Sequence, residues 1–244
     1  MAPDLFLLSS TSVHGYAPFE HALPALANFV GDARQIHFAP YAIVDQEYYS
    51  RRVGELMAPL GIEIVGLHAV DDPREAVEAA EVLFVGGGNS FRLLASLWEL
   101  GLVEPIRRRV QAGELRFIGS SAGTNMACPS LRTTNDMPIV QPPSFEALGL
   151  IPFQINPHYV DPDPGSTHRG ETREDRIVEF LQQNDVAVVG LREGSWLRRH
   201  GDSLRLDGVA GARLFQCGAA PSEHRPGDDL SQLLALEPRF DSPA

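Results

Sequence analysis

The sequence predicts an α/β fold in which a mostly parallel sheet is flanked by helices. Two features of the first half of the chain indicate this fold. Short apolar runs alternate regularly with longer amphipathic stretches, and the apolar runs are continuous, as in parallel strands that are buried on both faces. The chain has 244 residues, of which 43% are hydrophobic. This length and composition suit one domain, residues 1–244, with a full-sized core.

The first half of the chain supplies an alternating series of strands and helices. Each expected strand is a short, mainly apolar run, and each expected helix has apolar residues at three- and four-residue spacing. The expected strands are 5–9, 35–39, 62–67, 82–85 and 116–119. The expected helices are 19–30, 47–60, 73–80 and one long helix at 90–111.

The second half is less regular. The segment 137–167 contains seven prolines, which prevent one long helix or strand. We expect loops and short strands there, across the carboxyl end of the sheet, where function usually lies in open α/β folds. A helix at 171–182 and strands at 186–191, 194–200 and 203–206 follow, the last two joined by a hairpin turn. The polar residues after about 221 are expected to end in a loose tail.

Charge and composition restrict the partners of the chain. The formal net charge is −12, which repels the phosphate backbone of nucleic acids, so no nucleic-acid partner is expected. An anionic substrate would need a local cluster of arginines against this background. No apolar run reaches the roughly 18 residues of a membrane span, and residues 1–8 indicate a first strand, not a signal peptide. The two cysteines, Cys128 and Cys217, fit no metal spacing and suit a cytoplasmic protein.

The strongest motif is Gly119-Ser120-Ser121-Ala122-Gly123, which joins a predicted strand to a following helix. This G-x-S-x-G pattern is typical of a nucleophilic serine on a sharp turn, where small neighbours prevent clashes. The helix that follows offers free N–H groups to a developing oxyanion. Ser121 is therefore the expected nucleophile. Ser120 is the alternative, but it lies one residue early in the pattern.

A second turn of small residues, Gly86-Gly87-Gly88-Asn89-Ser90, also follows a strand and precedes a helix. We expect its backbone N–H groups to face Ser121 from the neighbouring strand and to complete an oxyanion hole. A dinucleotide or phosphate loop is the competing interpretation. The turn lacks the G-x-G-x-x-G spacing and the lysine of a P-loop, which argues against it.

A catalytic serine needs a base, and the chain has eight histidines. His158, in the loop-rich segment after the serine, is favoured by its position, and His168, in a nearby polar stretch, is the competitor. Glu193, just past a predicted strand, and Asp136 are the candidate carboxylates that would orient the imidazole. With Glu193 the order would be serine, histidine, glutamate, which differs from the usual order in α/β-hydrolases.

Taken together, these segments resemble peptidase E, the α-aspartyl dipeptidase family of serine peptidases. The resemblance covers most of the chain from the first strand to about residue 196, and its seven blocks stand in the family's order. The blocks are Ser9-Ser10-Thr11-Ser12, Gly86-Gly87-Gly88-Asn89-Ser90-Phe91, Gly119-Ser120-Ser121-Ala122-Gly123, Arg132-Thr133-Thr134-Asn135-Asp136-Met137-Pro138-Ile139, Ile155-Asn156-Pro157-His158, Gly170-Glu171-Thr172-Arg173-Glu174 and Glu193-Gly194-Ser195.

The resemblance implies a fold related to class I glutamine amidotransferases and a catalytic triad of Ser121, His158 and Glu193. It also implies oxyanion donation from the backbone N–H groups of Gly88 and Ala122. The expected reaction is hydrolysis of dipeptides with an N-terminal aspartate (Asp-X), without metal or cofactor. A homodimer is expected on the same ground.

An acidic substrate explains the arginines at 169, 173 and 176 in an otherwise acidic chain. A guanidinium can bind a carboxylate through two parallel hydrogen bonds, and Arg173 is the first choice, followed by Arg169 and Arg132. The competing interpretation is pairing with acidic neighbours on the helix surface. Asn89 and Asp136 are further substrate-binding candidates, for the amide or the free α-amino group.

Two other functions stay open. A cyanophycinase-like enzyme would use the same machinery to cut a β-aspartyl polymer. A catalytically silent, amidotransferase-like binding module would need no nucleophile. The presence of the serine, histidine and glutamate argues against the silent module, and a fluorophosphonate label on the serine would separate the two classes.

Overall fold

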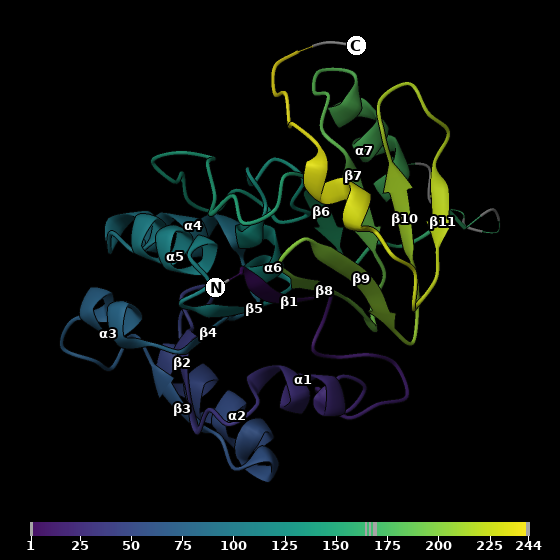
Figure 1. The fold of residues 1–244 in the computed structure, drawn as a ribbon. Coiled ribbons are helices and arrows are strands. Elements are labelled where there is room, and N and C mark those ends of the chain that lie inside the picture. The colour runs from purple at the N-terminus through teal and green to yellow at the C-terminus, as the bar shows by residue number, and fades with distance from the viewer. Residues whose placement is uncertain (1, 164, 166, 168–169, 243–244) are drawn as a thin grey trace.

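The computed structural model describes residues 2–163, 165, 167 and 170–242. Its strands form one seven-stranded sheet and one four-stranded sheet (Figure 1). In the seven-stranded sheet the order is β3-β2-β4-β5-β1-β8-β9. The strands of this sheet are β1 (Asp4–Leu8), β2 (Gln35–Ala39), β3 (Glu63–Gly66), β4 (Val82–Val85), β5 (Arg116–Ser120), β8 (Ser195–His200) and β9 (Ser203–Gly208).

The first five strands of this sheet pair in parallel, and β8 and β9 extend it in antiparallel fashion beyond β1. A mostly parallel sheet was predicted from the continuous apolar runs, and the prediction is confirmed. The four residues of β4, for example, are all buried. Such a strand needs cover on both of its faces.

Helices supply this cover on both sides of the sheet. The helices are α1 (Leu23–Val30), α2 (Gln46–Met57), η1 (Ala58–Leu60), α3 (Pro73–Ala79), α4 (Ser90–Glu99), α5 (Val103–Gln111), α6 (Ala122–Ala127), α7 (Arg173–Leu181) and η2 (Ser231–Ala235). None of these helices is both long and apolar enough to cross a bilayer, within the part of the chain that the structure describes.

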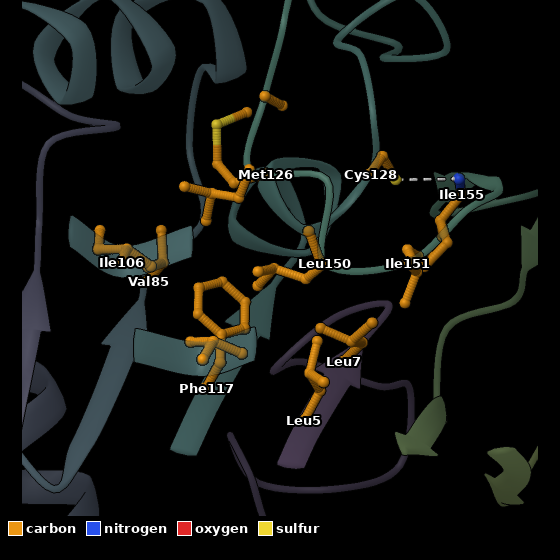
Figure 2. Close-up of a cluster of buried hydrophobic side chains, with 14 of the residues drawn as sticks. Leu5, Leu7, Val85, Ile106, Phe117, Met126, Cys128, Leu150, Ile151 and Ile155 are labelled. Carbon is orange, nitrogen blue, oxygen red and sulfur yellow. Dashed lines mark hydrogen bonds between the residues drawn. The ribbon is translucent and has the colours of Figure 1, made fainter. Parts of the chain in front are cut away.

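Alternate residues of each strand enter two separate cores, because successive side chains of a strand point to opposite faces. Phe6 and Leu8 pack with α1 and α2. Leu5, Leu7 and Phe117 pack on the other face with α3, α4, α5 and α6. Figure 2 shows this second core around Phe117, with Leu5 and Leu7 of β1 beside it. The two cores fix the sheet and hence the positions of its carboxyl ends.

The long helix predicted at 90–111 is wrong. The structure has two helices, α4 and α5, separated at Leu100–Leu102. Gly101 lies between them with φ of 65°, a left-handed conformation that ends α-helices and that glycine adopts without steric cost. The apolar spacing continues across the break, which is why the pattern alone did not show it.

The second sheet has the order β11-β10-β7-β6. Its strands are β6 (Gln154–Pro157), β7 (Val188–Leu191), β10 (Ala212–Phe215) and β11 (Ser222–His224). Strand β6 is the one strand within the proline-rich segment 137–163, and it pairs in parallel with β7. The segment after residue 221, expected to end in a loose tail, contains β11 and η2, and Leu230 and Leu233 of this segment are buried.

Candidate active site

The carboxyl ends of several strands converge on one place. Ser121 directly follows β5, the Gly86–Gly88 turn follows β4, and His158 directly follows β6. Glu193 lies two residues beyond the end of β7. This arrangement agrees with the general rule that ligands bind outside the carboxyl ends of parallel strands.

Ser121 lies on a tight turn between β5 and α6. Its φ and ψ are 53° and −114°, a backbone conformation that a side-chain-bearing residue keeps only when the surroundings impose it. Gly119 and Gly123 allow the turn: a Cβ at Gly123 would lie 1.9 Å from the Val85 carbonyl oxygen, and one at Gly119 would lie 2.7 Å from the Gly123 oxygen. The Ser121 N–H donates to the carbonyl oxygen of Leu8 at 3.1 Å.

Three side chains form a continuous hydrogen-bonded series. The Ser121 hydroxyl lies 2.8 Å from Nε2 of His158, and Nδ1 of His158 lies 2.6 Å from Oε1 of Glu193. The His158 and Glu193 side chains are partly exposed, at 36% and 50%. The nucleophile candidate, the base candidate and one carboxylate are thus in the geometry that a serine hydrolase requires.

The alternatives to these three residues lie elsewhere. Ser120 belongs to β5 and is buried. His168 lies outside the described residues. Asp136 lies in a loop that contacts the first residue of α4, where its Oδ2 accepts hydrogen bonds from the N–H and hydroxyl of Ser90 at 2.7 and 2.6 Å. Glu193, and not Asp136, is the carboxylate that the structure places against the imidazole.

The turn after β4 lies against the serine. A Cβ at Gly87 would be 3.1 Å from Cβ and 3.6 Å from Oγ of Ser121. Gly88 has φ of 134°, and a Cβ there would lie 2.7 Å from the carbonyl oxygen of Ala42, so this position requires glycine. Within the described part of the chain, no hydrogen bond uses the N–H of Gly88 or of Ala122. Both groups thus remain available as oxyanion donors.

Arg173 differs from the other arginines of the candidate substrate site. It is the first residue of α7 and is partly buried, and it makes no ion pair with a described residue. Partial burial, followed by the nearby charge of Arg176, lowers the pKa of its guanidinium, while the charge of Asp136 acts in the opposite direction. A partly desolvated cation without an ion partner is suited to bind an anionic group.

The competing arginines are engaged or lie outside the described part of the chain. Arg132 pairs with Asp241 at 2.7 Å, and Arg176 lies 3.5 Å from Glu171 on the surface of α7. Arg169 lies outside the described residues. Of the two described arginines predicted to bind a substrate carboxylate, Arg132 is thus paired and Arg173 has no ion partner among the described residues.

The side chain of Asn89 makes its hydrogen bonds to other parts of the protein. Its Oδ1 accepts from the Arg92 N–H at 3.1 Å as the N-cap of α4, and its Nδ2 donates to the carbonyl oxygen of Met137 at 2.9 Å. The Asn89 amide thus links the start of the proline-rich segment to α4.

Among the described residues, no group of three His, Cys, Asp or Glu side chains is arranged as a metal site.

Ser9 belongs to the first of the family blocks, and the sequence pattern predicted no role for it. In the structure its hydroxyl accepts a hydrogen bond from the N–H of His158 and donates one to the carbonyl oxygen of Leu191, at 2.9 and 2.7 Å. A serine directly after the first buried strand is the one sequence signal that could have indicated this contact. The partner residues lie too far along the chain to be identified from the pattern.

Comparisons with known proteins show what this chain is similar to. The model of peptidase family S51 matches residues 5–207. Peptidase E of Streptomyces coelicolor is 55% identical over 239 residues, which cover 98% of each chain. A Drosophila melanogaster protein named probable alpha-aspartyl dipeptidase is 46% identical, over 96% of this chain and 98% of its own. The crystal structure of a peptidase from an acI-B1 actinobacterium has the same fold, with a TM-score of 0.65, 19% identity and coverage of 94% and 97%.

Proposed function

The chain belongs to peptidase family S51, and from this premise we propose that it is a serine dipeptidase that hydrolyses Asp-X dipeptides. The family supplies the reaction class, a serine peptidase. The relative named as an alpha-aspartyl dipeptidase supports the substrate. The observation that carries the proposal is the hydrogen-bonded series from Ser121 through His158 to Glu193.

In this reaction Ser121 Oγ attacks the carbonyl carbon of the N-terminal aspartyl residue. Nε2 of His158 takes the hydroxyl proton and then gives it to the amine of the leaving residue. Glu193, hydrogen-bonded to Nδ1, holds the imidazole in orientation and stabilises the imidazolium. The N–H groups of Gly88 and Ala122 stabilise the oxyanion. Water, activated by the same histidine, then hydrolyses the aspartyl-enzyme ester and restores Ser121.

Arg173 is proposed to bind the side-chain carboxylate of the substrate aspartate. Its partial burial and the absence of an ion partner among the described residues support this role. A site built around a guanidinium discriminates against an uncharged side chain, because the buried cation is then left unpaired. Asp136, whose charge acts on Arg173, is the proposed partner for the free α-amino group of the substrate. Asn89 is proposed to support this side of the site by holding Met137.

The experiment that tests the function is a hydrolysis screen of Asp-X, Glu-X, Asn-X and β-Asp-X dipeptides, with purified protein. We expect Asp-X to be hydrolysed with the highest kcat/KM. Preference for β-Asp-X would instead support the cyanophycinase-like enzyme. Turnover of none of the four, together with no fluorophosphonate label on Ser121, would support the silent binding module and contradict the proposal.

The protein is further proposed to act as a cytoplasmic homodimer. The family resemblance supports the dimer. The two free thiols, Cys128 and Cys217, support the location, because they suit a reducing compartment. Sedimentation at several concentrations tests the dimer, and cell fractionation tests the location. A monomer at all concentrations would contradict the first feature without affecting the proposed reaction.

A further inference from the structure

The dipeptide Leu8-Ser9 at the end of β1 contacts the backbone near each of the three residues of the proposed triad. The carbonyl oxygen of Leu8 accepts from the N–H of Ser121 at 3.1 Å. The N–H of Ser9 donates to the carbonyl oxygen of Ser195, two residues after Glu193, at 3.0 Å. The hydroxyl of Ser9 reaches the third residue, His158.

The Ser9 hydroxyl makes two hydrogen bonds in opposite directions. It accepts from the backbone N–H of His158 at 2.9 Å and donates to the carbonyl oxygen of Leu191 at 2.7 Å. Leu191 is the last residue of β7, two residues before Glu193, and its carbonyl oxygen also accepts from the N–H of Tyr159 at 3.1 Å. One fully buried hydroxyl therefore links the segment that carries the base to the segment that carries its orienting carboxylate.

The backbone of His158 needs such a restraint. Its φ is 53°, in the left-handed region that non-glycine residues occupy only when neighbouring contacts hold them there. The hydrogen bond from Ser9 is made to the N–H of this same residue. Without this hydrogen bond, the N–H of His158 would lose its acceptor, and the backbone position from which the imidazole projects would no longer be fixed.

From these contacts we propose that Ser9 is a positioning residue for the triad, which sets the distance between His158, Ser121 and Glu193 without touching the substrate. This inference rests on the proposed serine mechanism. A displacement of about 1 Å in a catalytic group can reduce the rate about 10²-fold. Ser9→Ala removes both hydrogen bonds of the hydroxyl and leaves the substrate-binding residues in place.

The test compares Ser9→Ala with Ser130→Ala, a matched removal of a buried hydroxyl. Ser130 is also buried, and among the described residues its hydroxyl takes part in one hydrogen bond, which it accepts from the Arg132 N–H at 3.4 Å. For Ser9→Ala we expect kcat on Asp-Leu to fall roughly 10- to 100-fold with KM changed less than about threefold, and the rate of fluorophosphonate labelling of Ser121 to fall in parallel. Ser130→Ala should keep kcat within about twofold of the parent protein.

A double variant separates positioning from general destabilisation. If Ser9 acts through the histidine, adding Ser9→Ala to His158→Ala should reduce labelling little further, because residues that act as a unit are not additive. Equal losses in both backgrounds, or a Ser9→Ala kcat within about twofold of the parent, would overturn the proposal. Should Ser9→Ala fold poorly, Ser9→Cys fills the same space with a weaker acceptor, and the same loss of kcat is expected.

The outcome is distinct from that of the proposed function. Failure of the serine mechanism would be seen as full activity in Ser121→Ala. Failure of the present inference alone would leave Ser121→Ala inactive and Ser9→Ala active.

Discussion

At the scale of single residues, the site depends on two backbone conformations that are costly for residues other than glycine. Ser121 and His158 both have φ of 53°. Each such conformation costs on the order of 1–3 kcal/mol and persists only where surrounding contacts hold it. The N–H of Ser121 is held by Leu8, and that of His158 by Ser9. The same β1 end thus supports both conformations and brings the hydroxyl and the imidazole to 2.8 Å.

The first prediction concerns the nucleophile. Ser121→Ala should reduce kcat by several orders of magnitude, roughly 10⁴- to 10⁶-fold, because the acyl-enzyme can no longer form. Far-UV circular dichroism and the Tm should change little. Ser120→Ala is the control, because Ser120 precedes the turn and is buried in β5. An inactive Ser120→Ala beside an active Ser121→Ala would reverse the assignment.

The second prediction separates the two carboxylates. Glu193→Gln should lower kcat by about 10⁴-fold or less with little change in KM, because the imidazole remains but loses its charged partner at 2.6 Å. Asp136→Asn should act mainly on KM, because Asp136 contacts Ser90 and not the imidazole and is the proposed partner of the substrate's α-amino group. Steady-state kinetics on Asp-Leu measure both. A kcat loss confined to Asp136→Asn would show that the orienting carboxylate is misassigned.

The third prediction concerns substrate selection. A charge-assisted contact contributes about 1.5–3 kcal/mol, so Arg173→Ala should lower kcat/KM for Asp-X roughly 10- to 150-fold. The preference for Asp-X over Asn-X should shrink, and Arg173→Lys should restore only part of it, because an ammonium does not reproduce the planar fork. Arg176→Ala is the matched control: it lies on the same helix but pairs with Glu171 at the surface. An unchanged Asp-X to Asn-X ratio in Arg173→Ala would contradict the role.

At the scale of elements, the parts that the sequence predicted are those governed by local pattern. The five parallel strands are continuous apolar runs, and the nucleophile turn is marked by small residues on either side of Ser121. The break between α4 and α5 was missed because Gly101 interrupts the backbone without interrupting the apolar spacing. Strands β10 and β11 were not predicted, since each is short and partly polar.

Long-range contacts set the other limit of prediction. The residue pattern alone did not decide between Glu193 and Asp136, and only the family resemblance favoured Glu193. Which of the two carboxylates contacts the imidazole depends on the pairing of β6 with β7, because this pairing brings His158 beside the end of β7. The role of Ser9 has the same origin, as its hydrogen-bond partners lie 149 and 182 residues away in sequence.

The fourth prediction is made at the level of the strand-turn-helix element. Gly123→Ala places a Cβ 1.9 Å from the carbonyl oxygen of Val85. This oxygen belongs to the backbone of a buried strand, so it cannot shift without a loss of folding free energy. Overpacking of this kind costs roughly 1–3 kcal/mol or more, so the Tm and the activity should both fall. Gly54→Ala is the control, because its Cβ would lie 3.9 Å from Ile64 within helix α2. That change should be neutral or stabilising by up to about 1 kcal/mol. Equal Tm values for the two variants would contradict the packing argument.

At the scale of the whole molecule, an ion network joins the base-bearing loop to the second sheet. Arg192 makes two hydrogen bonds to Asp161, at 2.6 and 2.7 Å, and also contacts Glu223 of β11 at 2.9 Å. Arg192 directly precedes Glu193, and Asp161 lies three residues after His158. The network therefore connects the segments that carry His158 and Glu193 to β11, in a chain whose net charge is −12.

The fifth prediction follows from the charge of Asp161. Its hydrogen bonds to Arg192, opposed by partial burial, lower the pKa of this carboxyl below the ordinary value of 3.8. A lowered pKa in the folded state means that the ionised carboxylate stabilises the fold above its ordinary pKa, and that this stabilisation disappears as the pH falls through the lower, folded-state pKa. The side chain is 46% exposed, so solvent screening limits the contribution to about 1 kcal/mol or less.

Asp161→Asn should accordingly lower the Tm at pH 7 by at most about 2–4 °C, as expected for a domain of this size. The difference from the parent protein should shrink when both are measured near pH 3 or below, because the parent then also loses the charge. Glu179→Gln is the control for removal of one negative charge, since Glu179 is exposed on α7 and makes no ion pair within the described residues. Its Tm should match that of the parent at both pH values. A Tm difference for Asp161→Asn that stays constant from pH 7 to about pH 3 would show that the ion pair with Arg192 does not stabilise the fold.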